Sequence, residues 1–408
     1  MKPQRKTGTR VIKWVLLLPV ILIALVLLLV PVVLSSAKSR QLILAKINES
    51  VAGHTNFADL SMGWLKGVRV EDFSYKDDTG RIAVQAQRIA TVPHYTSILT
   101  GRLSFGQTVI DDPKVEINLR EPAPKTAARP SSPPQPVPTK AAGIALVTDV
   151  VVKDGTLRIT DPEGRTVEAT QINSKLGLRP PGEQSTFALS MAVSNKGKPS
   201  TVRADGRVTP GGSKTGWSLK GTSGEVTVEV NDLDLESIAP FLALGGIDVQ
   251  AQGVVSGNAK GEINDGQFGG LTGKITAKDL DVTGPALKGD RLQTRDLDID
   301  AKLNRKGDTI DIENLQLKTD WATASASGTV PTTFGSFNDF LEAGSNYNLE
   351  GNFKCDVAAV SSQMSHTLGL KKGMQITSGQ LSGNVQTLTE AGRRQVRGQA
   401  TLAGLEGT

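Results

Sequence analysis

Residues 349–357, Leu-Glu-Gly-Asn-Phe-Lys-Cys-Asp-Val, alternate without interruption between apolar or small residues and polar residues. Because successive side chains of a β-strand point to opposite faces, this stretch has one apolar face and one polar face. All of its charged residues fall on the polar side. Such a strand belongs to an antiparallel sheet that is wet on one side. The stretch therefore predicts a mainly β fold.

The same period of two recurs along most of the chain. The apolar members of these runs are Phe187, Leu189, Met191 and Val193; Val202, Ala204, Gly206 and Val208; Val226, Val228 and Val230; Ile247, Val249, Ala251, Gly253 and Val255; Leu297, Ile299, Ala301 and Leu303; Ala322, Ala324, Ala326, Gly328 and Val330; and Val396, Gly398, Ala400 and Leu402. The parity changes between Val230 and Leu233 and again between Ile312 and Leu315. Each change turns the following side chains over, so we expect a β-bulge or a break at both places.

The charge balance of the chain gives no argument for a nucleic-acid partner. The formal net charge is +5, and the first thirteen residues hold five lysines and arginines and no acid. The rest of the chain is therefore neutral, and the basic character belongs to the N-terminal flank. Cys355 is the only cysteine, which excludes an intramolecular disulfide. Aromatic residues make up 4% and glycines number 43, which fits an extended body of strands and turns.

Residues 14–34 contain no charged residue and reach about 30 Å as a helix, the thickness of a bilayer's hydrocarbon core. The basic flank before them predicts a cytoplasmic N-terminus. We expect a single membrane anchor whose apolar residues include Trp14, Leu16, Leu17, Leu22, Leu28 and Leu34. A cleaved signal peptide is the alternative, because Ser35-Ser36-Ala37 resembles a cleavage site. The run exceeds the ~7–15 apolar residues of such a signal, which favours the anchor.

The chain also repeats itself, since Gly253-Val-Val-Ser-Gly-Asn258 matches Gly379-Gln-Leu-Ser-Gly-Asn384.

Residues 121–142 contain seven prolines, which predicts a disordered linker that is dispensable for folding. These patterns predict a cytoplasmic flank over 1–13, a transmembrane helix over 14–34, an amphipathic connector helix over 35–51, a β unit over 52–120, the linker over 121–142, one β module over 143–284, and a second over 285–408 that we expect to be truncated. A plain connector helix is the alternative over 35–51.

Enzyme signatures are absent from the sequence. There is no phosphate loop, nucleophile elbow or zinc-binding spacing. Asp232-Leu-Asp-Leu-Glu236 places carboxylates on one face of a strand, a pattern that acid–base or calcium chemistry can use. The alternating leucines explain that pattern as the solvated face of a strand. We expect no enzyme activity, no cofactor and no metal.

Five segments resemble the AsmA-like family, which includes the TamB type. They are Gly63-Trp-Leu-Lys-Gly-Val-Arg-Val-Glu-Asp-Phe73, Ser97-Ile-Leu-Thr-Gly-Arg-Leu103, Asp112-Pro-Lys-Val-Glu-Ile-Asn-Leu119, Val152-Lys-Asp-Gly-Thr-Leu-Arg-Ile-Thr-Asp161 and Asn231-Asp-Leu-Asp-Leu-Glu-Ser-Ile-Ala-Pro-Phe-Leu242. The resemblance implies an elongated, taco-like β-groove shared with chorein-type bridge proteins. It also implies a single-pass inner-membrane protein with a periplasmic body, acting in outer-membrane biogenesis by carrying phospholipid. The alternative is a scaffold that engages outer-membrane proteins through sheet edges.

On this interpretation one apolar face holds acyl chains along a body on the order of 90–100 Å. The residues expected to contact lipid are Phe187, Leu189, Met191, Val226, Val228, Val230, Ile247, Val249 and Ile275. The expected partners are the inner membrane, phospholipid, and an outer-membrane or envelope protein at the distal end, with no nucleic acid. A closed, dry β-sandwich would produce the same alternation, so the sequence leaves both architectures open.

Overall fold

The computed structural model describes residues 35–408 except 65, 95–96, 98–103, 121–146, 196–197, 214–215, 245–248, 333–347, 367, 371–372 and 391–392. The predicted flank and anchor over 1–34 and the proline-rich segment 121–142 therefore lie outside the described residues. Among the helices that are described, none is long and apolar enough to cross a membrane.

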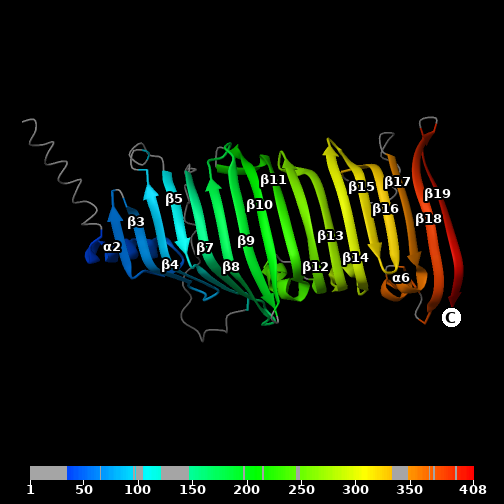
Figure 1. Ribbon diagram of the computed structural model, residues 1–408, viewed down its shortest axis with the longest axis horizontal. Helices are drawn as coiled ribbons and strands as arrows, with labels where there is room; N and C mark the ends of the chain where they lie inside the picture. Colours follow the sequence, from blue (N-terminus) through cyan, green and yellow to red (C-terminus); the bar gives the residue numbers. More distant parts are fainter. Residues whose placement is uncertain are drawn as a thin grey trace, which may run out of the picture.

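The described residues form one nineteen-stranded sheet whose strands lie side by side along the long axis (Figure 1). The helices are α2 (Ala37–Ser50), η1 (Leu235–Ile238), α4 (Ala239–Leu244), η2 (Pro285–Leu287) and α6 (Val357–Gln363). The strands are β1 (Gly53–Asn56), β2 (Asp59–Gly63), β3 (Gly67–Asp77), β4 (Ile82–Pro93), β5 (Ser104–Asp111), β6 (Lys114–Asn118), β7 (Val147–Thr160), β8 (Thr166–Leu178), β9 (Ser185–Asn195), β10 (Lys198–Ser213), β11 (Gly216–Asp234), β12 (Gln250–Asn264), β13 (Gln267–Thr283), β14 (Arg291–Lys306), β15 (Thr309–Thr319), β16 (Ala322–Pro331), β17 (Asn348–Asp356), β18 (Ile376–Glu390) and β19 (Arg393–Gly407).

The sheet is mixed, which corrects the expectation of a wholly antiparallel body. β5 and β6 share one position between β4 and β7, and both run parallel to β7. From β7 to β19 each strand pairs antiparallel with the next. Parallel neighbours need a crossover of a dozen or more residues. The chain between Asn118 and Val147 supplies that crossover.

Both predicted irregularities are confirmed as register shifts. The β11–β12 register shifts between Val230 and Leu233, where Asp232 has a φ of 51°. The β15–β16 register shifts between Ile312 and Leu315. Aspartate enters the left-handed region more readily than most residues, so it suits the extra position of a bulge. The apolar side chains after each shift therefore return to the face of those before it.

A short helix follows β11 and another follows β17, and the two begin alike. Asp234 caps η1 and Asp356 caps α6, each accepting a hydrogen bond of 3.0 Å from a backbone N–H. Ser237 and Ser361 are buried, and each donates to the backbone carbonyl three residues earlier. The two caps are 122 residues apart, so the same order of strand, helix and strand recurs along one continuous sheet.

The buried core is small and lies beneath η1 and α4. It consists of Ile159, Val167, Ala169, Val193 and Leu233, against which Ile238 of η1 and Phe241 of α4 pack. No second sheet faces the first one in the part of the chain that the structure describes. The sheet is therefore a single layer, closed by helices only over short stretches.

Asp161 is a fully buried carboxylate in the turn between β7 and β8. It accepts hydrogen bonds from the Arg165 backbone N–H at 2.8 Å and from Arg165 Nε at 2.6 Å. Burial raises the pKa of this carboxyl, but the bonds from Arg165 outweigh burial and place the pKa below its ordinary value of 3.8. The stability that Asp161 contributes is therefore present above that value and is lost as the pH falls through the folded-state pKa.

We expect Asp161→Asn to lower the free energy of unfolding at pH 7 by about 2 kcal/mol, because the amide loses the charge-assisted bond to Arg165. Urea denaturation followed by circular dichroism measures this change. Glu168→Gln is the control, since it removes an exposed pair with Arg158 and should cost less than about 1 kcal/mol. Equal losses in the two variants would contradict a special role for the buried carboxylate.

Candidate functional site

The strand registers show which side chains share a face, because residues directly opposite each other point the same way. One row of opposed residues runs through Val228 and crosses every strand position from β2 to β19. Its members are Leu60, Val70, Ile89, Ile110, Val152, Ser174, Leu189, Ala204, Val228, Ala259, Gly273, Ala301, Leu315, Ala326, Gly351, Val385 and Gly398. Ser174 is the single polar member, so the row is an almost unbroken apolar line, hereafter the central row.

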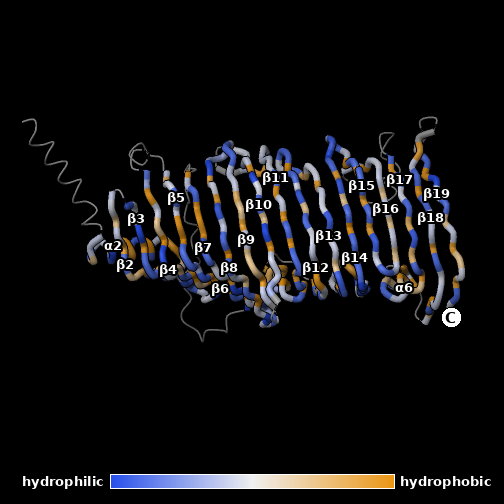
Figure 2. Tube along the Cα trace, viewed as in Figure 1, coloured by the Kyte–Doolittle hydropathy of each residue, from blue (hydrophilic) through white to orange (hydrophobic). Residues whose placement is uncertain are grey.

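Two flanking rows lie on the same face. One joins Leu176, Phe187, Gly206, Val226, Gly261, Leu271, Leu303, Ile312, Gly328 and Leu349. The other joins Met191, Val202, Val230, Gly257, Ile275, Ile299, Leu317, Ala324, Phe353, Gly383 and Ala400. The three rows together are the apolar face of the sheet, and Figure 2 shows the alternation that produces them.

Seven of the nine residues expected to contact lipid lie on this apolar face: Phe187, Leu189, Met191, Val226, Val228, Val230 and Ile275. Val249 lies directly before β12, and the described registers give it no partner. Ile247 lies outside the described residues. At ~4.8 Å per strand the central row is roughly 75 Å long, shorter than expected, because β1 with β2 and β5 with β6 each share one strand position.

The apolar face is open to solvent at several of its strands. Val226, Val228 and Val230 are each only half-buried, and Ile275 is 38% exposed. Contiguous apolar surface that stays exposed marks a site for a lipid or protein partner. A closed sandwich would bury these side chains, so the structure supports an open face. Burial is found where η1 and α4 cover the core and at Leu60, Ala301 and Ile312.

Most members of the central row from β10 onward are alanine or glycine. The flanking rows carry the larger side chains, including the Phe187 ring, which lies over Gly206 of β10. Gly261, between Val226 and Leu271, has open space where a side chain would stand. The open space at Gly261 therefore lies in a flanking row, while the small residues are concentrated in the central row.

The opposite face is polar and carries ion pairs between adjacent strands. Glu225 lies between Lys260 Nζ at 2.7 Å and Arg207 Nη2 at 2.8 Å. The hydrogen bond from Lys260 is the largest reason that the pKa of Glu225 lies below its ordinary value. Lys274 Nζ pairs with Asp300 at 2.9 Å farther along the sheet. These pairs hold the register on the wet face and leave the apolar face free of charge.

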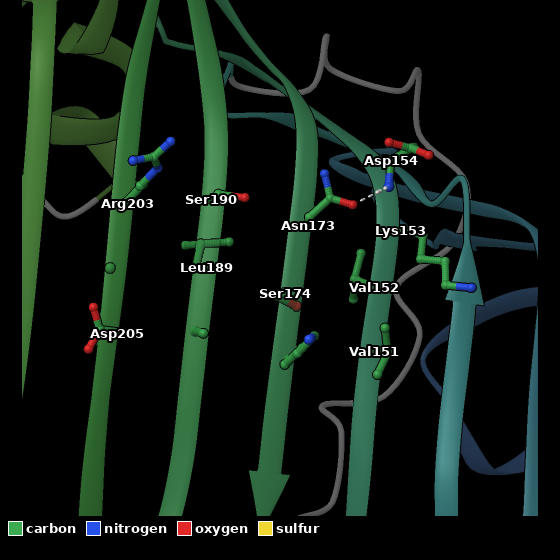
Figure 3. Close-up of a pocket in the computed structure, with 13 residues that line it drawn as sticks. Val151, Val152, Lys153, Asp154, Asn173, Ser174, Leu189, Ser190, Arg203 and Asp205 are labelled. Carbon is green, nitrogen blue, oxygen red and sulfur yellow. Dashed lines mark hydrogen bonds between the residues drawn. The ribbon is translucent and has the colours of Figure 1, made fainter.

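A hollow of about 610 Å³ lies over β7–β10 (Figure 3). Its lining includes the polar-face residues Val151, Lys175, Ala188, Arg203 and Asp205. Phe187 and Met191, which flank Leu189 on the apolar face, are not part of that lining. Val152, Ser174, Leu189 and Ala204 of the central row also line the hollow, so it lies at the central row, with charges of both signs around it.

Sequence reasoning missed the N-terminal end of the central row. Leu60, Val70, Ile89, Ile110 and Val152 belong to it, although none of them is among the residues expected to contact lipid. The pattern is broken here by residues with positive φ, Asp72, Asp112 and Asp154. These aspartates mark the places where the alternation of apolar and polar residues changes parity. They are the sequence signal that could have extended the central row into these strands.

Within the described residues no group of three or more histidine, cysteine or acidic side chains is placed to hold a metal ion. A search of curated proteins found no match to the chain. A family model described as YhdP protein matches residues 1–337, most of the 408-residue chain. That family belongs to the AsmA-like superfamily, so the resemblance holds at this level, while the finer AsmA or TamB assignment stays a prediction. The chain belongs to the YhdP protein family.

Proposed function

We propose that this protein is a non-enzymatic component of the cell envelope that binds phospholipid acyl chains on its apolar face and lets them pass along it. The observation that carries the proposal is the central row, which stays apolar from β2 to β19 apart from Ser174. Membership of an AsmA-like family supports the envelope setting. In this proposal residues 14–34 anchor the chain in the inner membrane, the body is periplasmic, and the protein serves outer-membrane biogenesis.

An acyl chain can be held on the apolar face by the burial of its CH₂ groups alone, without a specific pocket. Each CH₂ group that an acyl chain buries contributes roughly 0.8 kcal/mol, so several groups on the apolar face hold a lipid. Neighbouring strands present similar apolar side chains. An acyl chain that moves by one strand therefore replaces its contacts with similar ones. A lipid can therefore bind along the row and still move, while its headgroup remains beside the open side of the sheet.

The alternative is a scaffold that binds outer-membrane proteins through a sheet edge. β19 pairs with β18 along one side, and no described strand pairs with its other side, which favours strand addition there. An edge scaffold needs no apolar line across the whole sheet. Acyl-chain binding explains why the central row is apolar across the whole sheet, and we therefore prefer the lipid proposal.

The proposal is tested by placing a benzophenone amino acid at Leu315 of the full chain and irradiating it in cells. Leu315 lies in the central row, and its neighbour Gln316 points to the polar face. We expect phospholipid adducts from position 315 and none from position 316, read by mass spectrometry of the purified protein. Equal labelling at the two positions, or none at 315, would contradict acyl-chain binding on this face.

A further inference from the structure

Helix α2 is fixed to the first strands of the sheet. The Asn48 side chain donates to the Thr55 carbonyl at 3.1 Å and accepts from the Thr55 N–H at 2.7 Å. Arg40 donates to the carbonyl of Ala58, and the N–H of Met62 donates to Ser35 Oγ at 2.8 Å. These bonds fix the orientation of α2 relative to β1 and β2.

The side of α2 that faces outward combines one large apolar side chain with two cations. Ile43 and Ile47 are half-buried, whereas Leu42 is 72% exposed. Lys38 and Lys46 stand one turn before and one turn after Leu42, on the same stripe of the helix, and both are exposed. Lys46 Nζ lies 3.0 Å from the exposed Glu49 carboxylate, so Lys38 is the cation of the stripe that has no acid paired with it in the described contacts. An exposed leucine between two lysines is the arrangement of a helix that lies at a bilayer surface, where the leucine enters the apolar layer and the lysines reach the phosphates.

We propose that the Lys38–Leu42–Lys46 stripe rests on the bilayer that holds residues 14–34, with a preference for anionic phospholipid. This rests on the anchor in the proposed function. Only Ser35 and Ser36 separate the uncharged run from α2, and at ~3.5 Å per residue the helix begins within about 10 Å of its end. The helix therefore lies within reach of the headgroups, and the positive charge of its stripe complements an anionic leaflet.

The placement of α2 decides where lipid meets the sheet. Because α2 is bonded to β1 and β2, the stripe holds the first strands against the bilayer, and Leu60 of β2 begins the central row there. Lipid would then pass from the leaflet to the apolar face at the α2 end of the sheet. α2 and β19 lie at opposite ends of the long axis, so the remaining strands lead away from this membrane (Figure 1).

The test uses the full chain with Cys355→Ala and a single labelling cysteine, Ala45→Cys, on the exposed side of α2. A polarity-sensitive fluorophore at position 45 is read in vesicles of phosphatidylethanolamine and phosphatidylglycerol that contain a nitroxide-quencher lipid. We expect strong quenching there, and none for the same label at Lys274→Cys on the polar face. Vesicles without phosphatidylglycerol, or the pair Lys38→Glu and Lys46→Glu, should lower the quenching by about fivefold or more.

Leu42→Gln should lower the quenching to the level of the label at Lys274→Cys, while Leu42→Met should keep it. Vesicle flotation separates the two proposals. A chain that floats but is not quenched at position 45 overturns the placement of α2 alone. A chain that does not float overturns both the anchor and this placement. Quenching that is unchanged by Leu42→Gln also overturns the placement.

Discussion

Val228→Asp is expected to leave the sheet folded and to reduce bound phospholipid at least tenfold. Val228 is half-buried at the centre of the apolar face, and its neighbours in the central row are Ala204 and Ala259. A carboxylate at this position keeps access to water, so the penalty for burying an unpaired charge is largely avoided. An acyl chain that crosses the same strand must either desolvate the charge or lose its contacts. Circular dichroism and extraction of bound lipid from the purified full chain measure the two effects.

Two control variants show how a folded or an unfolded Val228→Asp protein is to be interpreted. Ile159→Asp places the same charge in the closed core, where the side chain is 0% exposed, and should unfold the region around η1 and α4. Thr227→Asp places it on the polar face and should change neither fold nor lipid. A folded Val228→Asp variant with the parental lipid content would contradict the lipid proposal at this position. An unfolded one would indicate that the face is covered.

Deletion of residues 121–142 is expected to detach β5 and β6 from β7. Asn118 lies opposite Thr160, and Val147 lies opposite Ser104, so the crossover must return along the whole of β7, about 40 Å. The deletion leaves residues 119, 120 and 143–146, which reach at most ~25 Å. From this geometry we expect the opposite of what composition alone predicts, namely that the segment is dispensable. Amide hydrogen exchange over residues 104–118 is expected to show lost protection.

Deletion of residues 126–137 is the matched control. It removes most of the same proline-rich stretch but leaves enough chain to reach roughly 55 Å when extended, so the pairing with β7 should survive. Protection over 104–118 that is kept in both deletions would show that the crossover does not limit the pairing. Loss in both would point to a need for the particular residues and not for their length.

Most of the sheet beyond β8 could be predicted from the sequence because a half-exposed strand has a strict period. The runs at Leu297–Leu303 and Ala322–Val330 fix their faces without any tertiary information, and the bulge before Leu233 follows from parity alone. The same period could not separate an open face from a closed sandwich. That distinction depends on what packs above a residue such as Val228, which is a tertiary property.

The parallel pairing with β7 could not be predicted, because strand direction is not encoded in a strand's own pattern. It depends on where the chain after Asn118 returns, and composition alone described that stretch only as a linker. The hollow lined by Lys175 and Arg203 was also missed, since its lining comes from four strands and matches no motif. Leu42 could not be singled out from the sequence, because Ile43 and Ile47, four residues apart, form an equally apolar stripe, and only the structure shows that this stripe is half-buried while Leu42 is exposed.

The central row gains one residue with each strand, so the number of strands sets the length of the row. The strands β8–β13 and β14–β19 follow the same order around a short helix, and each set of six adds about 30 Å at ~4.8 Å per strand. Duplicating such a unit would lengthen the apolar line without altering the chemistry of any position in it. The width of the gap that such a protein can bridge would then be set by copy number, a quantity that gene duplication changes in a single event.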